Sequence, residues 1–531
     1  MLYTLLLSLL TDRPGGGGAR LLALPYLAQM LHATLLLLAA LGVALAPIRL
    51  PPLGRLAAFL IILGTPWSII IGTQAYNDAG MVLFGGLALV WSLGLVCPRP
   101  VEVRSRKDPR RWFLAALIGV LLGLALGCKL TAGVMFALPV AAIWLSCNRW
   151  KETLLSALLA TMIFAPWSLR SYAVTGNPIF PIAASTLGPG PWSPEQVQHW
   201  NAAHSAAQEV GGASLGHRLM ALAQASLLDD HWSISAANSE RWSAETIAPP
   251  HADAGGWSHL GWIWGIWLAA ATWGLWRGRT AHWPWRVGLA LGLQVAGWLF
   301  LTHLQARFLW PILPTLTLLV VSIWSADTPP TSRGWQLLCQ RGLALALAAA
   351  AVSTGFVVPQ EFKPAAVSPQ DASPLSREMF AGALLDYPTA ALPESWFRNT
   401  EGKLEGLSEN WRHTHEKKSE RTAAAKLLLL GSATPYFYDA NLIYTTAWDQ
   451  PAWLHLLQSG DPQHISTWLH QQNIRLIVID WTEMHRLHRS YATPEPLTPA
   501  TIQTLIQSHQ LQPLFPPAPI PCQVFLVPDQ E

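Results

Sequence analysis

Long apolar stretches alternate with short polar ones over the first two thirds of the chain. A helix needs roughly 20 mainly apolar residues to span the hydrocarbon core of a bilayer. Ten segments are expected to be membrane helices on this criterion: Leu21–Ala46, Leu56–Ala75, Ala79–Cys97, Trp112–Leu126, Leu130–Ser146, Thr153–Leu169, Trp257–Trp276, Val287–Leu301, Phe308–Ser325 and Leu343–Val358. The pattern predicts an α-helical polytopic membrane protein with about ten transmembrane helices over residues 1–358.

The pattern changes in the last third of the chain. Residues 359–425 are first rich in Pro and Ser and then densely charged, which is typical of a linker. From residue 426 onward, short apolar runs such as Leu427–Leu430 and Ile474–Ile479 alternate with helical patterns such as His464–Gln472 and Pro499–His509. Strands that alternate with helices predict a small soluble α/β domain over residues 426–531.

Composition supports a membrane protein. Charged residues make up 12% of the chain, against about 25% in an ordinary soluble domain. The 28 Trp residues favour the edges of a bilayer. A net charge of +3 is too small to suggest a nucleic-acid partner, and the five cysteines form no CxxC pair. We therefore expect no nucleic acid, no metal site and no cofactor.

Basic residues set the expected orientation. They gather in the polar segments 98–111, 148–151, 277–286 and 326–341, which all fall on one side if the helices alternate. The positive-inside tendency makes that side cytoplasmic. The opposite side then holds the long loop 170–256 and everything after residue 358. Ten spans also place Met1 outside without a signal peptide, from which we expect a chain shortened at its N-terminus.

Polar residues at the outer ends of apolar helices are the candidates for chemistry. Charged groups inside a membrane are costly and usually face a cavity or a partner. Lys presents a point charge and Arg a two-pronged donor, and both bind phosphate oxygens. We interpret one set of residues as the lining of a single cavity for an anionic group: Tyr76, Asn77, Asp78, Lys129, His303 and Arg307. The alternative is that each residue lies in interfacial water at a helix end.

Four segments carry a family resemblance. They are Thr65–Leu89 with its Ala-Tyr-Asn-Asp stretch, Gly123–Thr131, Pro166–Pro178 and Gln305–Pro314. In this order they resemble motifs of the GT-C fold glycosyltransferases that use polyprenyl-phosphate sugars. That group, similar to glycosyltransferase family 39, includes the protein O-mannosyltransferases and the aminoarabinose transferases. The resemblance covers roughly residues 1–358.

The resemblance implies a multi-pass enzyme of the bacterial inner membrane, with the C-terminal domain in the periplasm. Such enzymes transfer a sugar, with inversion, from a polyprenyl-phosphate donor to a lipid, glycan or protein acceptor of the cell envelope. It implies that Lys129 and Arg307 stabilise the lipid phosphate. It also implies that Asp78 is the second acidic residue of the site, and that Tyr76, Asn77, Arg170, Asn177 and His303 bind substrate.

The family's main catalytic base lies in a first outer loop, after a first helix, and neither has a counterpart in this sequence. We therefore expect lipid-phosphate binding with poor turnover. The alternative function is a non-catalytic subunit that binds polyprenyl phosphate or assists assembly. A secondary transporter is disfavoured because the helix pattern does not repeat in two halves.

Overall fold

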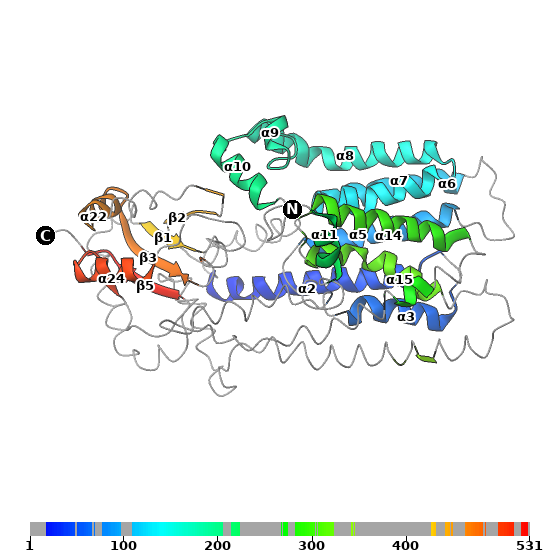
Figure 1. Ribbon diagram of the computed structural model, residues 1–531, viewed down its shortest axis with the longest axis horizontal. Coiled ribbons are helices and arrows are strands. Elements are labelled where there is room, and N and C mark those ends of the chain that lie inside the picture. Colours follow the sequence, from blue (N-terminus) through cyan, green and yellow to red (C-terminus); the bar gives the residue numbers. More distant parts are fainter. Residues whose placement is uncertain are drawn as a thin grey trace.

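A helical bundle and a smaller α/β unit make up the described structure (Figure 1). The computed structural model describes these residues: 17–47, 50–65, 68, 77–96, 109–204, 214–223, 267, 269–273, 282–302, 304, 306–322, 341–342, 345, 426–431, 441–446, 448–449, 462–481, 484, 498–513 and 522–528.

The bundle consists of helices that run side by side (Figure 1). They are α2 (Gly17–Ala44), α3 (Pro52–Gly64), α5 (Asp78–Val96), α6 (Pro109–Cys128), the π-helix η1 (Gly133–Ala137), α7 (Leu138–Leu145), α8 (Trp150–Thr175), α14 (His282–Leu301), the 3-10 helix η5 (Ala306–Ile312) and α15 (Leu313–Val321). The expected spans are helical wherever most of their residues are described. The spans expected at 257–276 and 343–358 lie mainly outside the described residues.

Among the described helices, α6 and α8 are long and apolar enough to cross a membrane, and five further apolar segments are shorter: Met30–Ala44, Pro52–Gly64, Asp78–Leu93, Gly133–Leu145 and Phe308–Val321. Helix α8 exposes apolar side chains along its length. Leu154, Leu158, Met162 and Leu169 are each more than half exposed. A row of exposed apolar side chains on a long helix fits contact with lipid.

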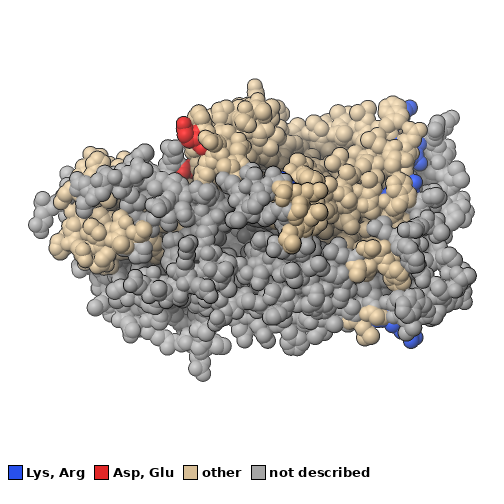
Figure 2. All heavy atoms as spheres, in the orientation of Figure 1, with Lys and Arg blue, Asp and Glu red and all other residues tan. Residues whose placement is uncertain are grey.

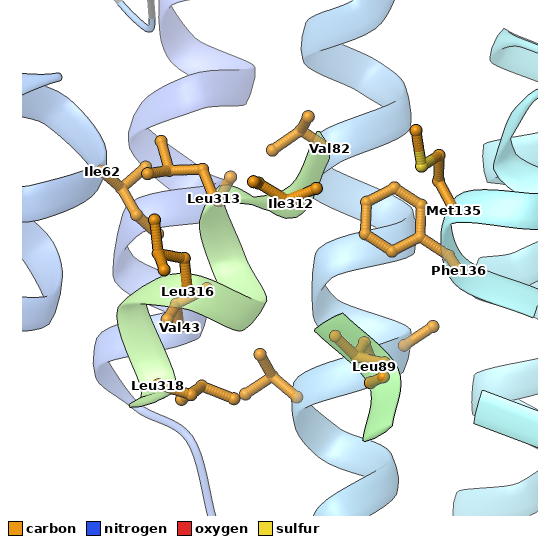
Figure 3. Packing of buried hydrophobic residues seen from close by; sticks show 14 of the residues in the cluster. Val43, Ile62, Val82, Leu89, Met135, Phe136, Ile312, Leu313, Leu316 and Leu318 are labelled. Atoms are coloured by element: carbon orange, nitrogen blue, oxygen red, sulfur yellow. The ribbon is translucent and has the colours of Figure 1, made fainter. Parts of the chain in front are cut away.

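The core of the bundle forms around α15, whose nine residues are all buried. Figure 3 shows Leu313 and Leu316 on the side of Ile62 of α3, and Ile312 beside Val82 of α5. Helix α15 packs against α3, α5 and α14. Because it is surrounded by other helices, α15 carries apolar residues on all sides and not along one stripe.

Small residues allow α6 and α8 to approach each other closely. A Cβ atom on Gly119 would lie 2.7 Å from the carbonyl oxygen of Ser156, and one on Gly123 would lie 2.8 Å from that of Ala160. The Ser156 hydroxyl donates a hydrogen bond to the carbonyl of Ala115 at 2.5 Å. Small residues spaced by four positions, with a hydroxyl bonded across the interface, are typical of helix packing in membranes.

A buried ion-pair cluster ties together the beginnings of these same two helices. Glu152 is fully buried, and its Oε1 accepts hydrogen bonds from Arg111 Nε and, at 3.3 Å, from Arg149 Nη1. Buried charges persist when they are paired. Here the pairing holds the start of α8 against the start of α6.

Basic and aromatic residues ring the end of the bundle where α6, α8 and α14 begin. Lys and Arg atoms appear at this end in Figure 2, whereas Asp and Glu atoms appear toward α10 (Pro194–Ala203). Exposed tryptophans stand beside cations on all three helices. The charged group lies 5.5 Å from the ring centroid for Arg111 and Trp112, 5.4 Å for Lys151 and Trp150, and 5.4 Å for Arg286 and Trp285. Such pairs suit a membrane–water interface.

The C-terminal unit contains a five-stranded sheet in the order β2-β1-β3-β5-β4. Its strands are β1 (Lys426–Leu430), β2 (Asn441–Tyr444), β3 (Ile474–Asp480), β4 (Gln512–Pro513) and β5 (Cys522–Leu526), with helices α22 (Pro462–Gln471) and α24 (Pro499–Gln507). Strand β1 runs parallel to β2 and β3, while β5 is antiparallel to β3 and β4. The expected strands at 427–430 and 474–479 and both named helices are present. Strands β2 and β4 were not expected.

Candidate functional site

An ion pair joins the start of α5 to the end of α6. Lys129 Nζ lies 2.7 Å from Asp78 Oδ1, and the Asp78 side chain is 4% exposed against 18% for Lys129. Beside it, Asn77 Nδ2 donates a hydrogen bond to the carbonyl of Cys128 at 2.5 Å. The structure thus brings together three of the residues that the sequence placed at one outer face.

Helix electrostatics favour each charge in its place. Asp78 is the first residue of α5, where the positive end of the helix dipole stabilises a carboxylate. Lys129 directly follows α6, and its N–H bonds to the carbonyl of Ala125, so its ammonium lies at the negative end of that helix. A Cβ on Gly80 would lie 2.8 Å from Cys128 Sγ, so glycine allows the two helix ends to meet.

The Phe308 ring also lies against Lys129. The ammonium lies 4.2 Å from the centre of the Phe308 ring, within cation–π range. Phe308 is buried in η5 and directly follows Arg307, whose backbone lies in the same short helix. The motif around Arg307 was noticed in the sequence, but a role for Phe308 was not. Tyr76, His303 and the Arg307 side chain lie outside what the structure describes.

The chain turns into the π-helix η1 four residues after Lys129. Gln294 of α14 is fully buried and donates from Nε2 to the carbonyl of Met135 in η1 at 2.6 Å. Thr131, between Lys129 and η1, donates to Met81 Sδ at 3.5 Å. Single π turns inside helices occur frequently at functional sites. Contacts from α5 and α14 therefore hold the segment that carries Lys129.

The Asn177 side chain is hydrogen-bonded within the loop that follows α8. It is fully buried, and its Nδ2 donates to the carbonyls of Ile182 and Gly188, both at 3.1 Å, while its Oδ1 accepts from the N–H of Ile179 at 2.9 Å. These bonds use both donors and the acceptor of the amide to hold the loop that follows α8. Arg170 is exposed on α8, and no described contact joins it to Lys129.

Lys129 can bind an anion, and Asp78 can orient the Lys129 ammonium for that contact. An ammonium carries three donors, so Lys129 can bridge a carboxylate and a phosphate oxygen. The Asp78 carboxylate is held by Lys129, which suits it to orienting that ammonium. An acid in this position is poorly placed to take a proton from an acceptor hydroxyl.

Comparisons with known proteins give three findings. A family model described as a domain of unknown function, DUF8201, matches residues 102–212, which include Lys129 and Asn177. No curated protein matches the chain. The chain is similar to two crystal structures of ArnT from Cupriavidus metallidurans.

The ArnT structure bound to undecaprenyl phosphate is 14% identical, with a TM-score of 0.47, and the match covers 94% of this chain and 83% of that one. For ArnT in the apo state the values are 13%, 0.46, 94% and 82%.

Proposed function

We propose that this protein binds the phosphate of a polyprenyl-phosphate sugar at the Asp78–Lys129 pair and acts as a GT-C type glycosyltransferase. The observation that carries the proposal is the ion pair itself, at the junction of α5 and α6, with the Phe308 ring against the ammonium. A cation that is oriented by a carboxylate and shielded by a ring is preorganised for an anionic group. The order of the four sequence motifs supports the sugar-transfer chemistry.

In the proposed reaction an acceptor hydroxyl attacks the anomeric carbon of the donor. The bond between that carbon and the phosphate oxygen breaks, and the electron pair leaves with the lipid phosphate. The hydroxyl proton passes to a general base. Lys129 stabilises the charge that develops on the departing phosphate, and Asp78 keeps Lys129 in place. The acceptor is a lipid, a glycan or a protein on the outer face of the membrane.

A second candidate function is binding of the lipid phosphate without transfer. The observation that favours it is the engagement of Asp78 by Lys129, which leaves this acid poorly placed to serve as the base. Incubation of the full chain with a donor that carries a radiolabelled sugar separates the two functions. Transfer or hydrolysis of the label supports the enzyme, and binding without release supports the binding subunit.

The binding site itself is tested with Lys129→Met. We expect labelled undecaprenyl phosphate to bind this variant about 10–100-fold more weakly in nanodiscs, since a charge-assisted hydrogen bond contributes roughly 1.5–3 kcal/mol. Lys151→Met is the matched control, because Lys151 is an exposed lysine at the opposite end of the bundle. Wild-type affinity in Lys129→Met would show that the phosphate does not bind at this site.

The proposed orientation places the start of α8 in the cytoplasm and α10 (Pro194–Ala203) in the periplasm. In a cysteine-free background, we expect Glu195→Cys to react with an impermeant maleimide in intact spheroplasts. Lys151→Cys is expected to react only after the membrane is opened. Both positions are exposed, so access to reagent and not burial decides the result. The reverse labelling pattern would overturn the orientation.

A further inference from the structure

The segment that follows α8 is fastened to that helix. Gly176 ends α8 in the left-handed conformation, with φ of 73°, which glycine adopts without strain. The hydroxyls of Ser168 and Ser171 then donate to the carbonyls of Pro178 and Asn177 at 3.1 and 2.8 Å. Together with the Asn177 amide bonds, these contacts fix the direction in which the chain leaves the bundle.

Helix α10 begins with a capping box that also reaches the C-terminal unit. The N–H of Gln196 donates to Ser193 Oγ at 3.3 Å, and Gln196 Oε1 accepts from the Ser193 N–H at 2.8 Å. The Nε2 of the same Gln196 donates to the carbonyl of Trp448 at 2.8 Å. The Gln196 side chain therefore caps α10 and also binds Trp448, which follows β2 (Figure 1).

Aromatic rings surround this hydrogen bond. The Trp448 ring lies 5.0 Å from His204, 5.7 Å from His199 and 6.4 Å from Trp192, measured between ring centroids. Trp200 stacks on His204 at 4.2 Å. All five rings are half-buried. Aromatic rings at these distances stabilise a contact beyond the area that they bury.

We propose that these five residues and Gln196 form an intramolecular docking contact, the Trp448 clasp, which holds the C-terminal α/β unit to the segment after α8 and opens when His204 is protonated. The partner of this surface is the chain's own Trp448, with Thr446 and Asp449 described beside it. The clasp links a unit with its own sheet and core to the end of the bundle at which Lys129 lies.

Burial of His204 explains why protonation opens the clasp. On the described parts of the two segments, the titratable groups are Glu195, His199 and His204 on one side and Asp449 on the other, where Asp449 Oδ2 accepts from the Thr446 N–H. Burial lowers the pKa of His204, and the hydrogen bond between its Nδ1 and the carbonyl of Trp200 only partly opposes this.

The sign of the pH effect follows from that shift. An undocked His204 with an ordinary pKa near 6.5 binds protons more readily than the docked one. The clasp is therefore fully stable above about pH 6.5, and it weakens as the pH falls through that value toward the lower pKa of the docked state.

Amide hydrogen exchange of the full chain in nanodiscs tests the clasp. In Trp448→Ala at pH 7.5, we expect residues 194–203 to exchange roughly tenfold faster, because three aromatic contacts and the packing around the Gln196 bond are lost. Tyr444→Ala is the matched control, since Tyr444 is an exposed aromatic residue on β2 of the same unit. Protection in α24 reports whether the unit remains folded.

Unchanged exchange at 194–203 in Trp448→Ala would overturn the clasp. If that variant loses protection in α24, Gln196→Ala carries the same test from the α10 side. The pH arm uses His204→Phe, which keeps a ring and removes the proton. Wild type and His199→Phe are expected to lose protection between pH 7.5 and 5, after correction for the intrinsic exchange rate, whereas His204→Phe is not. Equal loss in His204→Phe would overturn the proposed role of His204.

Discussion

Gly119→Val is expected to destabilise the bundle by about 3 kcal/mol or more, toward the upper end of what overpacking costs. A Cβ on Gly119 would meet the backbone of Ser156, at 2.7 Å from its oxygen and 2.8 Å from its Cα. Backbone atoms cannot rotate away as a flexible side chain can, so α6 and α8 must separate along their length. That separation also weakens the hydrogen bond from Ser156 to Ala115.

The measurement is thermal unfolding of the purified protein in a fixed detergent, together with the yield of monodisperse protein. Gly127→Val is the matched control because Gly127 lies on the same helix with no atom within 4 Å of its Cβ position. Gly123→Val is expected to behave like Gly119→Val, since its Cβ would lie 2.8 Å from the Ala160 carbonyl oxygen. Equal midpoints for Gly119→Val and Gly127→Val would contradict the close-packed interface.

The sequence predicted the positions of the described helices because long apolar runs are a strong local signal. Long apolar runs such as 153–169 correspond to α8, although the helix extends further at both ends. The sequence could not distinguish lipid-facing from buried helices. Both α8 and α15 are apolar, yet α8 is largely exposed while every residue of α15 is buried. That difference depends on which helices are neighbours, and composition does not encode it.

The candidate site was predicted in part. Asn77, Asp78 and Lys129 were expected on one face, and the structure adds that the two charges bind each other directly. Phe308 was missed because an apolar residue inside an apolar helix gives no signal. Asn177 was expected to bind substrate from its motif alone. Its hydrogen bonds to three backbone groups hold the loop after α8, and substrate binding by Asn177 stays a prediction.

Contacts between distant segments were beyond sequence reasoning. Gln196 and Trp448 are 252 positions apart, and no local sequence pattern pairs them. Strand β2 was missed for a related reason. Its four residues are too few to show an alternating pattern, and pairing with β1 defines the strand. Short elements that depend on partners appear only in the folded chain.

The Asp78–Lys129 pair is expected to show strong coupling in a double-mutant cycle. Removing one partner of a buried pair leaves an uncompensated charge, which costs about 3–5 kcal/mol when burial is complete. Because Lys129 is 18% exposed, we expect the lower end of that range for Asp78→Asn and for Lys129→Met. The double variant removes both charges and is expected to be less destabilised than the sum of the single variants, by about 2 kcal/mol. Thermal unfolding in detergent measures all four proteins.

Lipid-phosphate binding by the same four proteins assigns the roles within the pair. Asp78→Asn keeps the Lys129 cation and the Phe308 ring. Its affinity for undecaprenyl phosphate is expected to fall by no more than about threefold to tenfold, because the ammonium is then less well oriented. Lys129→Met and the double variant lose the cation and are expected to bind equally weakly. If Asp78→Asn binds as weakly as Lys129→Met, the carboxylate does more than orient the lysine, and Asp78 must contact the ligand itself. If the stabilities of the single variants simply add, the two charges do not depend on each other and the site must be built around another cation.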